Sequence, residues 1–292
     1  MKLFKKLRRE IATGLSKLGL HQLTVDYMGM RLVVPLLAGI GRGYLIAADF
    51  WMSRSLQAFT QLKSGAIIDV GANVGVFLVK LRVVDRERPY YGFEPHPVCN
   101  FYAQELIRLN RFPNTHYYPY ALSNEQEIRT LYASKLGDKM ASMHAFARDN
   151  AAQLGFSFEM VTQHGDSFIS ALGIEQVAAI KIDVEGAEWE VLQGLEQTIK
   201  QHRPFLFCEI WPLPESADPN YAVKLERRQC IFDFLQQMDY QILGVQSDAT
   251  LGWITSCDEM ASPYHPEYLF CPTEQQSQLY DTLRGVLDRD GL

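Results

Sequence analysis

Acidic side chains follow apolar segments that have the composition of buried β-strands. Four acids lie at or near the ends of such segments: Asp69, Glu94, Asp183 and Glu209. If the strands are parallel, their carboxyl ends meet at one edge of the sheet, and ligands of doubly wound folds bind in the crevice outside that edge. Carboxylates placed there accept charge-assisted hydrogen bonds from hydroxyl or amine groups. The sequence therefore predicts a ligand site lined by acids at the carboxyl edge of a sheet.

The segment IIDVGANVGVF, residues 67–77, predicts a strand, a tight glycine turn and the start of a helix. Gly71 permits a close or left-handed turn, and Gly75 lets the helix pack near the strand. The dinucleotide fingerprint would need glycines where Asn73 and Val76 stand, and no Gly-Lys-Ser/Thr follows as in a phosphate loop. A ligand would therefore meet the backbone of this turn without a pyrophosphate cradle. The alternative is a turn that serves only packing.

Glu94 ends the second predicted strand, 19 residues after Gly75. An acid at this place in nucleotide-binding folds holds the two hydroxyl groups of a ribose. The alternative is a solvated glutamate at the end of a strand. The joint spacing of the glycine turn and Glu94 favours a ligand that contains a ribose.

The segment KIDVEGAE, residues 181–188, places acids between a strand and a helix. Glu185 and Glu188 have an alternative role, because acids near a helix N-terminus interact favourably with its dipole. Asp183 lies at the carboxyl edge of the strand, near the switch point where ligands bind. Glu209 ends the next strand, and its alternative role is a salt bridge at the rim. No ligand spacing typical of a metal site accompanies these acids, so no metal ion is predicted.

Apolar segments alternate with helical patterns from residue 66 onward. The predicted strands cover residues 67–70, 90–93, 116–121, 178–182, 205–210 and 241–245, and the predicted helices cover 75–84, 98–109, 187–201 and 223–237. This alternation is typical of an α/β fold with a doubly wound, mainly parallel sheet. Residues 268–271 are predicted to add an antiparallel strand at the edge of that sheet.

The alternation is interrupted between residues 123 and 167. Residues 128–133 and 156–162 predict a strand pair on either side of a polar segment, residues 134–150. In a doubly wound fold such an insertion lies over the carboxyl ends of the strands, where it shapes the ligand site.

The N-terminal segment differs in charge from the rest of the chain. Residues 1–31 carry seven Lys or Arg and two acids, although the whole chain has a net charge of −6. Residues 2–18 place apolar side chains on one face of a predicted helix and basic side chains opposite. Such a helix lies either on an anionic membrane surface or on its own domain. We favour the second, because ordinary surface helices have this pattern.

The elements suggest three parts of the chain. Residues 1–65 would form a small cover, with the amphipathic helix, short strands within 28–46 and a helix over 50–62. Residues 66–272 would form the catalytic α/β domain, whose motifs lie within 67–212. Residues 273–292 would form a C-terminal helix or tail.

Composition narrows the class of protein. The chain has 292 residues with 47% apolar side chains, as expected of a globular protein, and its acidic charge argues against a nucleic-acid partner. Five cysteines without paired spacing, and the absence of a secretory h-region, favour a reducing compartment. The most apolar stretch, residues 32–51, is interrupted by Gly, Pro and charged residues and is not expected to span a membrane. We therefore predict a cytoplasmic location, with peripheral contact at the inner membrane face as the variant that the basic helix suggests.

Five motifs, taken in order, resemble the FkbM-type methyltransferases: IIDVGANVGVF at 67–77, FEP at 93–95, ALS at 121–123, KIDVEGAEWEVLQGL at 181–195 and EI at 209–210. The resemblance implies a class I, Rossmann-like fold that uses S-adenosylmethionine. It also implies, most often, methylation of hydroxyl groups on sugar-containing or natural-product molecules. The chain departs from the family at His96, where a small polar residue is common, and at residues 164–166, where Thr-Leu-Asp is usual. The role of Asp166 therefore stays open.

The resemblance assigns roles to individual residues. The methionine and ribose part of the cofactor would be bound by Asp69, Gly71, Ala72, Asn73 and Gly75. Glu94 would hold the ribose hydroxyls, and Asp183 would lie next to the transferring methyl group. The adenine would lie beside Ala121, Leu122 and Ser123.

Methyl transfer to a hydroxyl group needs alignment and a base. The displacement is in line, so much of its rate comes from placing the reacting atoms. A positioned base contributes ~10²–10⁴ in rate. The first candidate is Asp183, and behind it stand Glu185, Glu209 and His144.

We expect O-methylation of a saccharide or a glycosylated small molecule. One alternative is methylation of a protein or peptide side chain. Another is a membrane-docked binding module that retains the cofactor fold without turnover.

Overall fold

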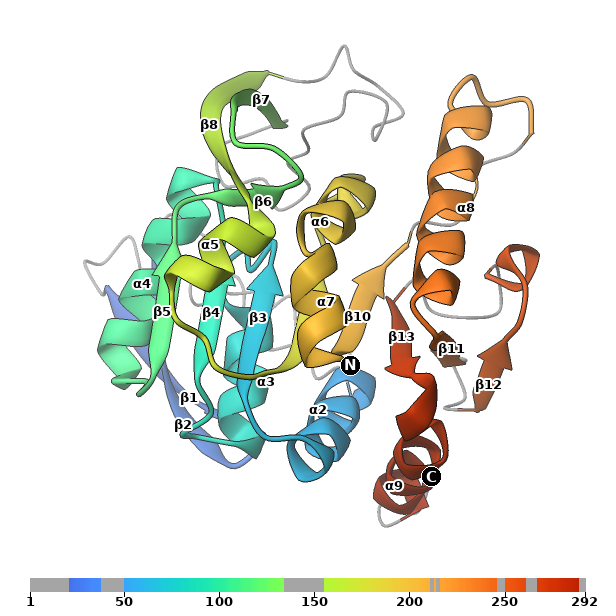
Figure 1. Ribbon diagram of the computed structural model, residues 1–292. Coiled ribbons are helices and arrows are strands. Elements are labelled where there is room, and N and C mark those ends of the chain that lie inside the picture. The colour runs from blue at the N-terminus through green and yellow to red at the C-terminus, as the bar shows by residue number, and fades with distance from the viewer. Residues whose placement is uncertain are drawn as a thin grey trace.

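The computed structural model describes residues 21–37, 50–133, 155–210, 213, 216–245, 250–260 and 267–288. Its centre is an eight-stranded sheet with helices on both faces (Figure 1). In spatial order the strands are β5 (Thr115–Tyr118), β4 (Tyr90–Phe93), β3 (Ala66–Val70), β9 (Val177–Ile182), β10 (Phe205–Glu209), β13 (Glu267–Pro272), β11 (Tyr240–Val245) and β12 (Leu251–Ile254). The strand order reverses between β3 and β9, so the switch point lies at their carboxyl ends.

The strands β5, β4, β3, β9 and β10 pair in parallel, which confirms the doubly wound α/β fold. An antiparallel strand near residues 268–271 is also confirmed, but its predicted place at the edge is wrong. β13 pairs with both β10 and β11 and lies inside the sheet, and the antiparallel edge strand is β12. The burial of β13 on both faces explains its position, because a strand that is apolar on both faces is protected only in the interior of a sheet.

The predicted strand over residues 116–121 is two strands in different sheets. β5 ends at Tyr118, and β6 (Ala121–Ser123) pairs in parallel with β8 (Phe156–His164). Pro119 lies between them and has no backbone N–H to donate, so the pairing of β5 cannot continue through it. β8 also pairs antiparallel with β7 (Ile128–Ala133), which confirms the predicted strand pair.

Eight α-helices complete the described fold: α2 (Phe50–Leu62), α3 (Val76–Val84), α4 (Pro97–Asn110), α5 (Gly165–Ala171), α6 (Glu188–Gly194), α7 (Glu196–His202), α8 (Tyr221–Gln237) and α9 (Gln276–Asp288). Short 3₁₀ turns occupy Cys257–Glu259 and Thr273–Gln275. The prediction of one helix over 187–201 is wrong, because this segment forms two helices, α6 and α7, with a break between them. A Cβ atom on Gly194 would overlap the carbonyl oxygen of Ser123, so α6 and β6 approach more closely than another residue would permit.

Asp166 has a structural role at this break. Its carboxylate accepts hydrogen bonds from the backbone N–H groups of Gln197 (2.9 Å) and Thr198 (2.8 Å), in the first turn of α7. A carboxylate there satisfies N–H groups that have no partner within the helix and meets the positive end of its dipole. Asp166 therefore caps α7 from another element.

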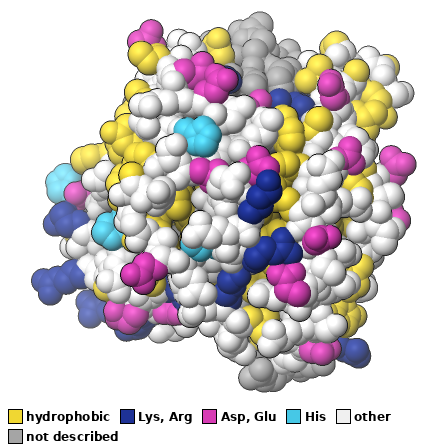
Figure 2. All heavy atoms as spheres, viewed as in Figure 1, with side chains coloured by type: hydrophobic (Ala, Val, Ile, Leu, Met, Phe, Trp, Pro, Cys, Tyr) yellow, Lys and Arg dark blue, Asp and Glu magenta, His cyan; other side chains and the backbone are white. Residues whose placement is uncertain are grey.

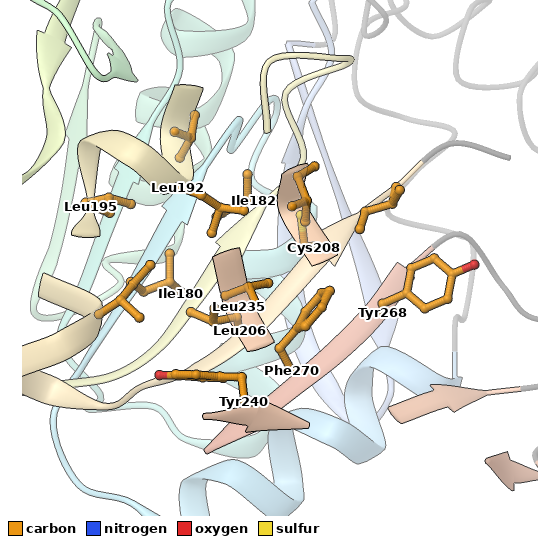
Figure 3. Packing of buried hydrophobic residues seen from close by; sticks show 14 of the residues in the cluster. Ile180, Ile182, Leu192, Leu195, Leu206, Cys208, Leu235, Tyr240, Tyr268 and Phe270 are labelled. Atoms are coloured by element: carbon orange, nitrogen blue, oxygen red, sulfur yellow. The ribbon is translucent and has the colours of Figure 1, made fainter. Parts of the chain in front are cut away.

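Two apolar cores lie on opposite faces of the sheet, since neighbouring residues of each strand point to opposite sides. Ile68, Ile180 and Leu206 face the core beneath α6, α7 and α8. Figure 3 shows this core, in which Leu192, Leu235 and Phe270 meet side chains of β9 and β10. The other core joins Ile67, Ala179 and Phe207 to α2, α3 and α9. Both faces of the central strands are buried, so the strands hold their ends in fixed positions.

The N-terminal strands pack on the central domain. β1 (Gln22–Tyr27) and β2 (Met30–Pro35) form a hairpin, and Leu32 and Val34 pack against α4. The Asn110 side chain joins the two elements by accepting from Val33 N and donating to Val33 O, each at 2.7 Å. The predicted helix over 2–18 and the polar segment 134–150 lie outside the described residues.

The surface carries side chains of both charges. Figure 2 shows Lys and Arg side chains gathered at the lower left, in the area of α4 and the β1–β2 hairpin, with acidic side chains among them. In the described part of the chain, no helix is both long and apolar enough to cross a membrane.

Candidate functional site

A cavity of about 440 Å³ lies at the carboxyl ends of β3, β4, β9 and β10. Most of the residues predicted to bind a ligand line it: Gly71, Ala72, Asn73, Glu94, Ala121, Leu122, Asp183, Glu185 and Glu209. Three others lie behind or beside its wall: Asp69, Gly75 and Ser123. His144, a candidate base, lies outside the described residues.

The glycine turn after β3 wraps around the end of β4. Gly71 and Asn73 have left-handed backbone angles, with φ values of 78° and 48°. The N–H groups of Gly71 and Ala72 both donate to the carbonyl oxygen of Phe93 at 3.0 Å. The turn therefore lies against the end of the neighbouring strand and presents its backbone to the cavity.

Glu94 fastens the same turn. Its side chain accepts hydrogen bonds from Asn73 N (2.8 Å) and His96 N (2.7 Å), and burial raises the pKa of its carboxyl to about 7. Each carboxylate oxygen has a second lone-pair site, so Glu94 can accept further hydrogen bonds from the cavity side. Tyr117 donates its hydroxyl to Asn73 O at 2.5 Å and supports the turn from β5.

Apolar side chains form the wall beyond Glu94. Ala121 and Leu122 of β6 line the cavity together with Leu131 of β7 and Met160 of β8. Ala121, Leu131 and Met160 pack on one another as a small buried cluster. Packing a flat apolar ring against this wall would remove the ring from water, which is energetically favourable. The sequence analysis missed Leu131 and Met160, although the alternation of the strand pair does place them on one face.

Asp69 is fully buried behind the cavity. Tyr90 donates its hydroxyl to Asp69 Oδ2 at 2.5 Å, and Lys181 Nζ lies 3.6 Å from Asp69 Oδ1. Asp69 therefore does not form part of the lining. It is connected to the cavity through Lys181, which does line it.

Lys181 is a site residue that the sequence analysis missed. It lines the cavity, and its Nζ donates to Asp183 Oδ2 at 3.0 Å. Burial alone would lower the pKa of Lys181, but the carboxylates of Asp183 and Asp69 outweigh burial and raise it above its ordinary value. The period of two along β9 puts residues 181 and 183 on one face, and this signal was available in the sequence.

Asp183 and Glu209 meet at the ends of adjacent strands. β10 pairs with β9, with Cys208 opposite Ile182, so the next residues of both strands reach the cavity together. Their side chains form a hydrogen bond, and burial together with Asp183 raises the pKa of Glu209 far above its ordinary value. Two neighbouring carboxyl groups repel each other when both are ionised, so the protonation of Asp183 and that of Glu209 are coupled.

The loop that follows Asp183 is held from two sides. Glu185 and Gly186 have left-handed backbone angles, with φ values of 55° and 106°. The buried carboxylate of Glu188 accepts from Gly186 N at 2.9 Å, and burial raises its pKa to about 7. From α8, Arg227 donates to Gly186 O at 3.0 Å and forms an ion pair with Glu190. These contacts fix the loop beside the cavity.

The lining brings together groups of different chemistry. It combines a backbone turn, a buried glutamate, an apolar wall and a group of acids. Such a cavity suits a ligand that has hydroxyl groups, an apolar ring and a positive charge. Within the described ranges, no group of three His, Cys, Asp or Glu side chains is placed to hold a metal ion.

The sequence is similar to those of known methyltransferases. The sequence profile of the Methyltransferase FkbM domain matches residues 69–242. Methyltransferase sdnD of Sordaria araneosa is 25% identical over 187 residues, which cover 55% of this chain and 71% of that protein.

Two solved structures are similar to the chain. Methyltransferase FkbM of Methylobacillus flagellatus KT has a TM-score of 0.44 and 17% identity, with coverage of 71% of this chain and 43% of that one. The chain therefore spans less than half the length of that protein. A precorrin-6y C5,15-methyltransferase of Geobacter metallireducens GS-15 has a TM-score of 0.40 and 8% identity over 77% and 87% of the two chains.

Proposed function

Because the chain belongs to the FkbM methyltransferase family, we propose that it transfers a methyl group from S-adenosylmethionine to a hydroxyl group of a saccharide or glycosylated small molecule. The observation that carries the proposal is the order of features along the cavity. The glycine turn and Glu94 follow β3 and β4, and Asp183 and Glu209 follow or end the adjoining strands β9 and β10, while Ala121, Leu122, Leu131 and Met160 supply the apolar part of the same lining. A cofactor bound along this line would present its methyl group to the acids.

The residues near Glu94 would hold the nucleoside. The buried carboxylate has unused acceptor sites for two ribose hydroxyls, and such charge-assisted bonds are stronger than neutral ones. Ala121, Leu122 and Met160 would cover a face of the adenine. The backbone of Gly71 and Ala72 would lie along the methionine part.

S-adenosylmethionine supplies an electrophilic methyl group on a sulfonium centre. The chain would align the acceptor oxygen with that methyl carbon, and Asp183 would accept the hydroxyl proton as the carbon–oxygen bond forms. The carbon–sulfur bond breaks at the same time, and its electron pair stays on sulfur. Glu185, Glu209 and Glu267 line the same region and can accept hydrogen bonds from the further hydroxyl groups of a saccharide.

Titration calorimetry with S-adenosylhomocysteine tests the cofactor site. The purified full chain is expected to bind it, and Glu94→Gln is expected to weaken binding about tenfold or more, because one charged acceptor is lost. Thermal melting of both proteins controls for folding. A well-folded wild-type protein that binds neither S-adenosylmethionine nor S-adenosylhomocysteine would overturn the proposal.

Transfer of a labelled methyl group tests the acceptor. Label is expected in small saccharides or glycosylated molecules of the source cell, and activity is expected to persist in EDTA because the proposed chemistry needs no metal ion. Label that enters lysate proteins instead would favour a protein side chain as the acceptor.

A further inference from the structure

Lys181 is a buried cation at the boundary of the cavity. Its side chain is 11% exposed, and its Nζ lies 3.0 Å from Asp183 Oδ2 and 3.6 Å from Asp69 Oδ1. The same nitrogen lies 5.9 Å from the centre of the Phe77 ring. An ammonium group that has lost most of its water in this way depends on its carboxylate partners for stability.

The register of the strands determines the position of the Lys181 ammonium group. Asp69 of β3 is the direct partner of Lys181 of β9, and Asp183 follows two residues later on the same face. The N–H of Asp183 donates to Val70 O at 3.0 Å, so β3 and β9 stay paired up to the cavity. Lys181 therefore bridges two strands from a rigid position.

Lys181 forms an ion pair with one of the two hydrogen-bonded carboxyl groups, that of Asp183. The hydrogen bond between Asp183 and Glu209 requires one of the two groups to be protonated. Among the described residues, the ion pairs of Lys181 are with Asp69 and Asp183, and none is formed with Glu209. The attraction between opposite charges falls with distance, so the ammonium stabilises negative charge on Asp183 more than on Glu209.

We propose that Lys181 is a positioning residue that keeps the shared proton on Glu209 and leaves Asp183 as the anion that faces the acceptor. This assignment rests on the proposed function in one respect, which is the role of Asp183 as the base. The hydroxyl proton of the acceptor would pass to Asp183, while Glu209, already protonated, would donate a hydrogen bond to it. Without Lys181 the proton would reside on Asp183 for more of the time, and the base would be lost.

Other titratable groups surround the pair. The anionic or neutral ones are Asp69 on β3, Tyr90 and Glu94 at β4, Glu185 in the loop after β9, Glu188 at the start of α6, Cys208 on β10 and Glu267 on β13. None of these can replace an ammonium group. Two further cations are nearby: Lys80 lines the cavity from α3, and Arg227 of α8 is engaged with Glu190 and Gly186.

Nuclear magnetic resonance of ¹³C-labelled aspartate tests the proposal without an acceptor. The carboxyl resonance that disappears in Asp183→Asn reports the protonation of Asp183. Lys181→Met is expected to raise its titration midpoint by about one to three pH units, because the adjacent cation favours the ionised form. Lys181→Arg keeps a cation and is expected to keep the midpoint near that of the wild type.

Lys200→Met provides the matched control. Lys200 is exposed and forms an ion pair with Glu196 on the surface of α7. Removal of this charge is expected to leave the Asp183 midpoint unchanged. The proposal is overturned if the titration midpoint of Asp183 in Lys181→Met equals that of the wild type. It is also overturned if Lys181→Met and Lys200→Met shift this midpoint equally.

A second variant keeps the test open if Lys181→Met does not fold. Glu209→Gln retains a donor toward Asp183 but removes the second titrating group. The Asp183 resonance is then expected to titrate in one step, where the wild type shows a second, smaller step as Glu209 loses its proton. A second step that remains in Glu209→Gln would refute the shared proton.

The same preparations separate this inference from the proposed function. A wild-type protein that binds S-adenosylhomocysteine, with no shift in Lys181→Met, refutes the role of Lys181 alone. A shift in Lys181→Met, in a protein that binds neither form of the cofactor, refutes the proposed function alone.

Discussion

Gly71 lies directly against the backbone of Asp183. A Cβ atom built on Gly71 would overlap the Asp183 carbonyl oxygen, and the φ of Gly71 is +78°. The glycine turn and the acidic loop thus meet at a close backbone contact, although they lie far apart in the sequence. This contact sets the distance between the residues proposed to hold the cofactor and the acid proposed to act as base.

Gly71→Ala is expected to lower the free energy of unfolding by about 2 kcal/mol or more and to weaken binding of S-adenosylhomocysteine. Gly29→Ala is the matched control. Gly29 has a φ of +80° but nothing within 4 Å of the added Cβ, so it carries the backbone strain without the overlap. Urea denaturation and calorimetry measure the two effects. Equal losses of stability in both variants would show that overlap with Asp183 is unimportant.

Asp183→Asn is expected to retain cofactor binding and to lower kcat by about 10²–10⁴, because the amide has nearly the same shape but cannot accept the proton. Steady-state kinetics with an identified acceptor measures kcat and KM separately. Glu185→Gln, at another acid of the lining, is expected to lose less activity because the ion pair of Lys181 in the lining is with Asp183. Unchanged turnover in Asp183→Asn would remove Asp183 as the base.

Glu188→Gln is expected to change how stability depends on pH. Burial raises the pKa of Glu188 from 4.5 to about 7, so between these pH values the folded protein binds more protons at this site than the unfolded chain does. Its contribution to stability therefore falls as the pH rises from about 4.5 to 7. Glutamine keeps an oxygen for Gly186 N and carries no charge, so the variant should be more stable at pH 8 by roughly 1–3 kcal/mol.

Urea denaturation from pH 4 to pH 8 measures this effect. Glu196→Gln, at an exposed glutamate of α7, is the control, and its pH dependence is expected to follow the wild type. A Glu188→Gln variant with the same pH dependence as the wild type would contradict the buried, raised pKa.

The same substitution at two neighbouring arginines of α8 should change the free energy of unfolding in opposite directions. Arg228 is 3% exposed, and its Nε and Nη2 have no hydrogen-bond partner among the described residues, so Arg228→Met is expected to raise the free energy of unfolding by about 1–3 kcal/mol. Arg227 binds Glu190 and Gly186 O, so Arg227→Met is expected to lower the free energy of unfolding by a similar amount. Chemical denaturation compares them, and a loss of stability in both variants would refute the difference.

Local patterns in the sequence were sufficient for most elements but not for their ends or their neighbours. The strand at residues 67–70 and the helix at 50–62 follow from an apolar run and from a period of 3.6 residues, and both exist in the structure. The run 116–121 reads as one strand because its apolar pattern continues, yet Pro119 separates β5 from β6. Gly194 divides the helix predicted over 187–201 because α6 must approach Ser123.

The sequence by itself determined the chemistry of the cavity wall: a glycine turn after a buried strand, and acids at the ends of four strands. These features are local, because turn geometry and burial depend on residues a few positions apart. The tertiary structure alone decided which side chains meet. Lys181 reaches Asp69, and Asp183 meets Glu209, because β9 lies between β3 and β10 in a particular register. Strand order and register join segments distant in the chain, and no periodicity within one segment encodes them.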